Sequence, residues 1–312
     1  MTGLGEAAED YLAMRRALGF TLVGEARLLM RLVNYCHARE CEHLTTELML
    51  DWATEPGPRA HSAGTYYQGR KLAVARNFAR HLQILDPVTE VPPGDLLTAR
   101  APKLIPHLFT PEQVQALMRA AARITPPLKA STWSTLIGLL AVTGMRSGEA
   151  CRLDHDHVDL DQATLLIANT KFGKTRQVFL HPSTIAALRR YTDLRDRCCP
   201  NPATSAFFVS ARGGRLNVSQ VAPLFATLLD ATGITAAPGR RRPRPHDLRH
   251  SFAVATLIDF HHDGAPVEPR LPVLSTWLGH VDPKSTYHYL HAAPQLLTLA
   301  AQRIDDHERS RS

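Results

Sequence analysis

The sequence lacks several patterns that mark secreted, membrane-spanning and zinc-dependent proteins. Its five cysteines form no repeated CxxC framework, and the first residues show no basic-then-apolar export signal. No apolar run of about 18 residues appears, and no HExxH motif is present. We therefore expect a protein of the reducing cytoplasm that does not associate with a membrane.

Acidic residues are missing from one stretch of the N-terminal third. Between Glu55 and Asp86 the chain has none, although it holds five lysines and arginines there, namely Arg59, Arg70, Lys71, Arg76 and Arg80. Arg76 and Arg80 are four residues apart, so on a helix they share a face. We predict that the last four of these side chains contact DNA phosphates; the alternative is a solvated polar face.

Positive charge gathers beyond the first 100 residues. Those 100 residues carry 11 Lys or Arg against 12 Asp or Glu, which leaves 25 against 17 for the rest of the 312 residues. This excess of positive charge favours a nucleic acid as partner, because neutralising its phosphates releases counterions. The alternative is a soluble basic protein without this partner. The short basic loop GRRRPRP is part of this charge, and we predict DNA contacts for Arg240, Arg241 and Arg242.

The chain is too long for one typical core, and its patterning indicates two domains. Residues 1–85 show helical periodicity, residues 86–109 are proline-rich with little periodicity, and a capped helix begins after Thr110. Within residues 110–312, helical segments flank two β-rich runs that are joined by a Gly-containing turn over residues 163–182. The sequence therefore predicts a mainly α fold with a small β-hairpin (an α+β fold) and an interdomain linker at 86–109.

Polar side chains in four short segments lie where apolar packing would be expected to continue. In AVTGMRSGEACRL, Arg146 follows a buried apolar helix and its glycine turn, and Glu149 is three residues on. A guanidinium supported in this way suits phosphate oxygens, although a lone arginine is more often a structural ion-pair residue. In TKFGKTR, Lys171 and Lys174 lie at the tip of the predicted hairpin, where lysines are usually only solvated.

The third segment is HDLRH and the fourth is WLGH. His246 and Arg249 are three residues apart, so they project from one face of a helix. His246 and His250 have the i,i+4 spacing of a zinc pair, but a zinc site needs a further ligand and usually an acidic base, so we expect no metal. His280 ends the helix of the fourth segment, a place where a histidine by itself is more often structural.

Two tyrosines follow in STYHYLH, within a short predicted helix. Residues i and i+2 of a helix point to different faces, so Tyr287 and Tyr289 cannot serve the same site. If one of these phenols reacts, the other is packing.

Taken in order, TGMRSGEACRL, the lysine hairpin, HDLRHSFA, WLGH and TYHYLH resemble the tyrosine recombinase (phage integrase) family, including its Xer-like members. The resemblance covers residues 110–291, and residues 1–85 look like the family's SAM-like core-binding domain. It implies that residues 110–312 are a catalytic domain. It also implies an enzyme that cleaves and rejoins DNA at specific sites through a 3′-phosphotyrosyl intermediate, in integration, transposition or resolution.

The resemblance implies that cationic side chains stabilise the reacting phosphate. Arg146 and Arg249 would clamp its non-bridging oxygens, because a phosphodiester gains negative charge in its transition state. Glu149 matches a position that supports the first of these arginines. Lys171, preferred over Lys174, would protonate the leaving 5′ oxygen, since an alkoxide is a poor leaving group.

The remaining matched residues concern the nucleophile. A phenol has a pKa of about 10 and reacts at neutral pH only if a base or nearby cations assist it. His246 would accept the tyrosine proton or bond the phosphate, and His280 would complete the phosphate cradle. Tyr289 would be the nucleophile, because it follows His280 by nine residues as the family's tyrosine does, which leaves Tyr287 as packing.

The resemblance implies no cofactor, because a phosphotyrosyl link would conserve the energy of the cleaved bond. It implies double-stranded DNA with specific recombination sites, a homotetramer on that DNA in a bacterial nucleoid, and an accessory recombinase or DNA-bending protein as a further partner. We also predict DNA contacts by Lys174 and Arg176 of the hairpin. A type IB topoisomerase and a catalytically silent DNA-binding protein remain alternatives.

Two segments leave alternatives open. Residues 261–273 form a proline-containing insertion relative to the family. They are expected to lie outside the motifs, and whether they serve as an interaction surface stays open. The C-terminal segment after residue 293 is amphipathic and then charged, and it would pack either in cis or on a neighbouring protomer.

Overall fold

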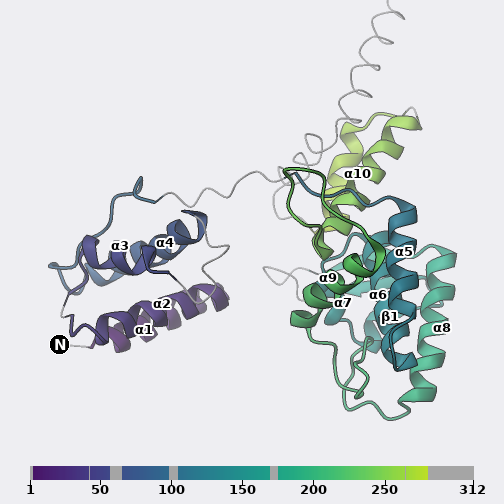
Figure 1. The fold of residues 1–312 in the computed structure, drawn as a ribbon, viewed down its shortest axis with the longest axis horizontal. Helices are drawn as coiled ribbons and strands as arrows, with labels where there is room; N and C mark the ends of the chain where they lie inside the picture. The colour runs from purple at the N-terminus through teal and green to yellow at the C-terminus, as the bar shows by residue number, and fades with distance from the viewer. Residues whose placement is uncertain are drawn as a thin grey trace, which may run out of the picture. The chain divides into compact units, whose positions relative to one another are not determined.

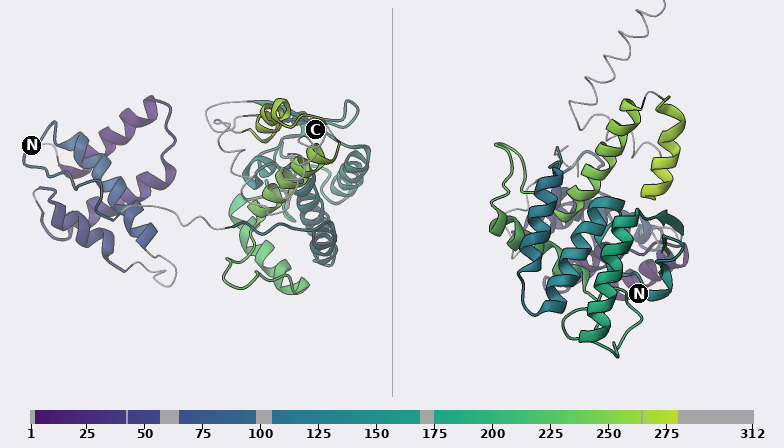
Figure 2. Two further views of the ribbon diagram at one scale, coloured as in Figure 1. Left: turned by 90° about the horizontal axis from the view of Figure 1, so that it is seen from above. Right: turned by 90° about the vertical axis from the view of Figure 1, so that its right-hand side faces the viewer.

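The computed structural model describes residues 3–41, 43–56, 65–97, 105–168, 175–263 and 265–279. The chain divides into two compact units, residues 1–103 and residues 104–312. Each unit has its own hydrophobic core. The ribbons of both units are drawn in Figure 1 and Figure 2. Within these described ranges, no helix combines the length and apolarity that crossing a membrane requires.

The N-terminal unit is helical. Its described helices are α1 (Leu4–Ala17), α2 (Val23–His37), α3 (Thr46–Thr54) and α4 (Thr65–Leu82). Their apolar residues recur at helical spacing, and this brings Leu32, Trp52 and Phe78 into one buried core. The hydroxyl of Thr45 accepts a hydrogen bond from Leu48 N at 3.2 Å, which fixes the start of α3.

The segment after α4 packs back on the N-terminal unit. The guanidinium of Arg76 donates to the carbonyl oxygens of Pro92 at 2.8 Å and Leu96 at 3.1 Å. The carboxylate of Glu90 accepts a hydrogen bond from the first main-chain N–H of α3 at 2.7 Å. The first half of the predicted linker at 86–109 therefore belongs to the folded unit, because these polar contacts and nearby leucines attach it there.

The C-terminal unit is built around the apolar helix α6 (Pro127–Thr143), which packs against α5, α8 and α10. Leu136 and Leu140 of α6 are buried in its core. The other described helices are α5 (Pro111–Ala122), α7 (Ser147–Cys151), α8 (Pro182–Cys198), α9 (Val221–Thr232), α10 (Pro245–His262) and α11 (Leu271–Leu278), with 3₁₀ turns at His155–His157, Val218–Gln220 and Glu268–Arg270.

A small antiparallel sheet completes this unit in the order β1, β2, β3. Its strands are β1 (Val158–Asp159), β2 (Thr164–Ile167) and β3 (Arg176–Phe179). Leu165 pairs with Val178 and Ile167 pairs with Arg176, so the buried side chains of the two longer strands share one face. The prediction of a mainly helical fold with a small β element is confirmed.

The predicted insertion, residues 261–273, includes the end of α10, the 3₁₀ turn at Glu268–Arg270 and the start of α11. Val267 and Leu271 are buried in a cluster that also holds Leu257 and Leu274. α11 then ends at Gly279, whose φ of 67° is left-handed.

Candidate active site

The turn between α6 and α7 presents Arg146. α6 ends at Gly144, which has a φ of 62°. A Cβ atom at this position would lie 2.5 Å from Cδ1 of Phe252 and 3.0 Å from Cδ2 of Leu278. Glycine is required here for two reasons, the left-handed backbone and the close approach of α10 and α11. Arg146 follows two residues later, at the N-terminal cap of α7.

Glu149 holds Arg146 by both its main chain and its side chain. Arg146 N donates to Oε2 of Glu149 at 2.9 Å, and Nη1 of Arg146 donates to Oε1 at 2.8 Å. The Glu149 side chain is 3% exposed, whereas the Arg146 side chain is 38% exposed. The guanidinium is therefore anchored on one edge and open to solvent on the rest, as a phosphate-binding group needs to be.

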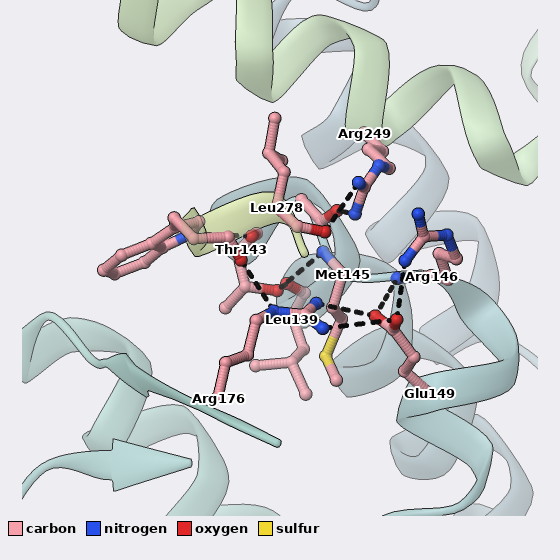
Figure 3. Close-up of polar contacts among 10 residues, drawn as sticks. Leu139, Thr143, Met145, Arg146, Glu149, Arg176, Arg249 and Leu278 are labelled. Carbon is pink, nitrogen blue, oxygen red and sulfur yellow. Dashed lines mark hydrogen bonds and ion pairs between the residues drawn. The ribbon is translucent and has the colours of Figure 1, made fainter. Parts of the chain in front are cut away.

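A second arginine reaches the same carboxylate from β3. Nη2 of Arg176 lies 2.8 Å from Oε2 of Glu149, and its Nε donates to the carbonyl oxygen of Trp277 at 2.7 Å (Figure 3). The Arg176 side chain is only 7% exposed and is bonded within the protein, which disfavours its predicted contact with DNA. Burial alone would raise the pKa of Glu149, but the hydrogen bonds from Arg176 and Arg146 lower it to about 2.

Arg249 joins the ends of two other helices. It lies on α10, is 1% exposed, and donates from Nη1 to Gly144 O at 2.8 Å and from Nη2 to Leu278 O at 2.6 Å (Figure 3). These carbonyls end α6 and α11, so the guanidinium holds both helix ends beside α10. Trp277 strengthens the same junction, since its Nε1 donates to Thr143 O at 3.0 Å.

His246 lies one helical turn before Arg249, with one part of the residue open to solvent and the other against the protein. Desolvation by the surrounding protein and then the guanidiniums of Arg249 and Arg146 lower the pKa of His246 to about 4. The neutral ring can therefore accept a proton at pH 7. It packs edge-on against the ring of His250, with centroids 4.8 Å apart. In the described ranges, no group of three or more His, Cys, Asp or Glu residues is placed to hold a metal ion.

An ion pair fixes the first turn of α10. Asp247 is fully buried and accepts from Nη1 of Arg241 at 3.0 Å, from Nη2 at 2.5 Å and from Arg244 N at 2.9 Å. This pair disfavours the predicted DNA contact of Arg241, because its side chain is 15% exposed and bonded to Asp247. Arg240 is exposed, and Arg242 is exposed while it contacts Asp230 at 2.6 Å.

The N-terminal unit corrects two further predictions. Lys71 is 2% exposed and donates to the carbonyl oxygen of Trp52, and Arg76 is 8% exposed and bonds the segment that covers α4. Neither side chain faces solvent, which disfavours the predicted phosphate contacts of both. Arg70 pairs with Glu25 at 3.5 Å near the surface, and Arg80 stays exposed.

Several predicted site residues, namely Lys171, Lys174, His280, Tyr287 and Tyr289, lie outside the described residues. The described chain stops at Gly279, and a Cβ atom there would lie 2.6 Å from Nη1 of Arg176. The position before His280 is thus in contact with the cluster of Arg146, Glu149 and Arg176. Sequence reasoning missed the inward direction of Arg176, although its strand alternation with the buried Val178 indicated it.

A large cavity of about 1070 Å³ lies elsewhere in this unit, among α5, α6, α8 and α10. Its lining is mainly apolar, with residues such as Met118, Val142 and Leu194. Arg146, Glu149, Arg176, His246 and Arg249 do not line it. These polar residues therefore form a cluster of their own at the ends of α6, α10 and α11, separate from the cavity.

The site thus places two arginines from separate segments and a histidine at the ends of α6, α10 and α11 of a mainly helical scaffold. Residues 107–295 match the phage integrase family. The chain belongs to this family, and it is a tyrosine-type site-specific recombinase of DNA.

Relatives agree with this assignment. The chain is 39% identical over 311 residues to "Putative integrase/recombinase y4rB" of Sinorhizobium fredii, covering 98% of each chain. It is 28% identical over 277 residues to tyrosine recombinase XerC of Alcanivorax borkumensis, covering 89% of this chain and 85% of that one.

The same fold occurs in two solved structures. The Tn1549 transposon integrase in complex with transposon right end DNA has a TM-score of 0.65 at 15% identity, covering 96% of this chain and 99% of that one. The XerA recombinase has a TM-score of 0.52 at 22% identity, covering 96% of each chain.

Proposed function

We propose that this recombinase cuts and rejoins DNA strands at specific sites through a 3′-phosphotyrosyl intermediate on Tyr289. The observation that carries the proposal is the junction at which Arg146 and Arg249 lie beside neutral His246, although they come from segments about a hundred residues apart. Two anchored guanidiniums are suited to the charge that develops on a phosphodiester.

The proposed step balances as a transesterification. The Tyr289 oxygen attacks phosphorus and the bond from phosphorus to the 5′ oxygen breaks. His246 takes the phenol proton, and Lys171 gives a proton to the leaving 5′ oxygen. Rejoining is the reverse reaction with a 5′ hydroxyl of another strand, so no nucleotide cofactor or metal takes part in the proposal.

The residues of the phosphate cradle have separate parts in this proposal. Arg146 offers the exposed part of its guanidinium to a non-bridging oxygen, while Glu149 holds the other edge. Arg249 supplies a fixed positive charge from α10 and His280 completes the cradle. A neutral His246 supports a base role, since a protonated imidazole could not take the phenol proton.

The proposed partners are double-stranded DNA with specific recombination sites, further copies of this chain in a homotetramer, and an accessory recombinase or DNA-bending protein. Among the structural neighbours, lambda integrase was solved as a tetramer bound to a Holliday junction and XerH was solved bound to its difH substrate. We propose that residues 1–85, which lie within the compact unit 1–103, form the core-binding domain. Phosphate contacts are proposed for Arg70, Arg80, Lys174, Arg240 and Arg242, and the site of action is the bacterial nucleoid.

Two assays test the function. Products that require two matched DNA sites support recombination, whereas relaxation of supercoiled plasmid without any such site supports a topoisomerase instead. A nicked site should trap a covalent protein–DNA adduct that resists denaturant. Tyr289→Phe should abolish the adduct and leave duplex binding nearly intact, and Tyr287→Phe is the matched control that should retain it. An adduct that survives in Tyr289→Phe would refute the assigned nucleophile.

A further inference from the structure

We propose that Arg176 is a positioning residue for cleavage, which acts through the shared carboxylate of Glu149 to set where Arg146 meets the scissile phosphate. The inference rests on the proposed function, because it concerns the residue that would clamp that phosphate. It also replaces the DNA-contact role that the sequence suggested for Arg176.

Arg146 and Arg176 each donate hydrogen bonds to both oxygens of the Glu149 carboxylate. Oε1 accepts from Nη1 of Arg146 at 2.8 Å and from Nη1 of Arg176 at 3.3 Å. Oε2 accepts from the main-chain N of Arg146 at 2.9 Å and from Nη2 of Arg176 at 2.8 Å. Each oxygen therefore has one bond from each arginine, which fixes both the position and the plane of the carboxylate.

Removing the Arg176 guanidinium would change this arrangement in a defined direction. Glu149 is buried, so the two hydrogen bonds it lost could not be replaced freely by water. The carboxylate would then draw the Arg146 side chain inward to satisfy both oxygens. Because Arg146 is held only by its edge, such a shift would carry its exposed nitrogens away from a bound phosphate.

The other side of Arg176 contacts the end of α11. Its Nε donates to Trp277 O at 2.7 Å, and its Nη1 would lie 2.6 Å from a Cβ atom at position 279. The guanidinium is thus a spacer of fixed size between Glu149 and the last turn of α11. Lysine would preserve the charge but could not make the contacts to Glu149 and Trp277 together, because its ammonium is a single point donor.

Arg195 offers a matched control within the same unit. Its side chain is 3% exposed, against 7% for Arg176, and it donates to the carbonyl oxygen of Phe207 at 3.2 Å and pairs with Asp196 at 2.6 Å. Substitution of Arg195 removes a comparably buried guanidinium. That guanidinium does not contact Arg146, Glu149 or the end of α11. A loss of stability common to both variants can therefore be separated from a change of the phosphate site.

The experiment measures single-turnover adduct formation at saturating DNA, below the melting temperature of every variant. Arg176→Gln and Arg176→Lys should each slow the adduct by about 10- to 100-fold with duplex affinity unchanged, and Arg195→Gln should cleave at nearly the wild-type rate. Normal rates in either Arg176 variant would overturn the proposal. If Arg176→Gln does not fold, the Arg176→Lys variant decides.

A second substrate shows whether the defect acts through the phosphate clamp. A methylphosphonate at the scissile position lacks the negative charge that Arg146 would neutralise, so the Arg176 variants should be slowed by less than about threefold there. Equal slowing on both substrates would contradict action through Arg146. If wild-type protein forms no adduct on either substrate, the proposed function itself fails, which is a different result from either outcome for Arg176.

Discussion

Arg249 and Gly144 are 105 residues apart in the sequence, and Nη1 of Arg249 donates a 2.8 Å hydrogen bond to the carbonyl oxygen of Gly144. The same guanidinium bonds Leu278 O at 2.6 Å, so one buried side chain connects the ends of α6 and α11 to α10. Arg249, which is expected to bind phosphate, therefore also holds the helix ends of the site together. Substitution of Arg249 should therefore cause two separate losses, one of stability and one of activity.

Arg249→Lys should lower both stability and activity. Lysine keeps the charge but cannot reach both carbonyl oxygens in fixed geometry, so the free energy of unfolding should fall by about 1.5–3 kcal/mol for the lost charged hydrogen bond. Chemical denaturation measures this term, and the adduct assay measures the loss of cleavage. A variant as stable as the wild type would show that the carbonyl contacts do not support the fold.

Gly144→Ala should be more damaging than Gly233→Ala. Both glycines end helices in the left-handed region, at φ values of 62° and 68°. A Cβ atom at position 144 would also meet Phe252 at 2.5 Å, whereas nothing lies within 4 Å of one at position 233. The control should lose about 1–2 kcal/mol of unfolding free energy for the backbone alone, and Gly144→Ala should lose clearly more. Equal losses of unfolding free energy in the two variants, measured by denaturation, would show that the close contact with Phe252 does not contribute.

Glu149 predicts a pH dependence of stability. Its pKa in the folded state is about 2, below the ordinary value of 4.5, so the folded state favours the ionised carboxylate. The associated stability is present above about pH 4.5 and is lost as the pH falls toward 2, by an amount on the order of a few kcal/mol. Acid titration of the unfolding free energy measures it, and Glu149→Gln should flatten that part of the curve. An unchanged slope in the variant would contradict the assignment.

His246 should titrate far below an ordinary histidine. Its pKa is lowered from 6.5 to about 4, so the folded state disfavours the protonated ring and stability rises with pH between these two values. NMR titration of the ring signal, assigned by its absence in His246→Gln, should show a midpoint near 4. Adduct formation should not lose rate through His246 protonation until the pH approaches 5. A ring midpoint near 6.5 would rule out this environment.

Lys71 and Arg80 should differ although both lie on the basic stretch of α4. Lys71 is 2% exposed, so Lys71→Met should change stability and leave the salt dependence of DNA binding as it was. Arg80 is exposed, so Arg80→Ala should leave stability nearly unchanged. If Arg80 contacts a phosphate, its loss should reduce the slope of log affinity against log salt by about 0.9. An unchanged slope would remove Arg80 from the DNA surface.

Short-range spacing predicted much of the site. Glu149 is three residues after Arg146, so one helical turn brings them together, and His246 and Arg249 lie on one face of α10 by the same rule. The β-hairpin was also predictable, because the change from a period near 3.6 to a period of two is a local signal. These features depend on neighbours in the sequence.

The predictions that the structure disfavours concern side chains whose partners are distant in the sequence or buried in the fold. Arg76 and Lys71 looked like surface cations, but the segment following α4 and the end of α3 supply carbonyl oxygens for them. Arg241 was assigned to DNA because its loop is basic, whereas the buried Asp247 takes up its charge. Arg176 was misjudged because Glu149 and Trp277 reach it from other elements, and composition contains no record of such contacts.

The most direct test of the account is to identify the atom that becomes attached to DNA. Adduct trapped on a nicked recombination site is digested with nuclease and protease, and the modified peptide is sequenced by mass spectrometry. The account predicts a nucleotide linked by its 3′ phosphate to Tyr289, with Tyr287 in the same peptide unmodified. A nucleotide on Tyr287 or on any other residue, or a 5′ linkage, would contradict it.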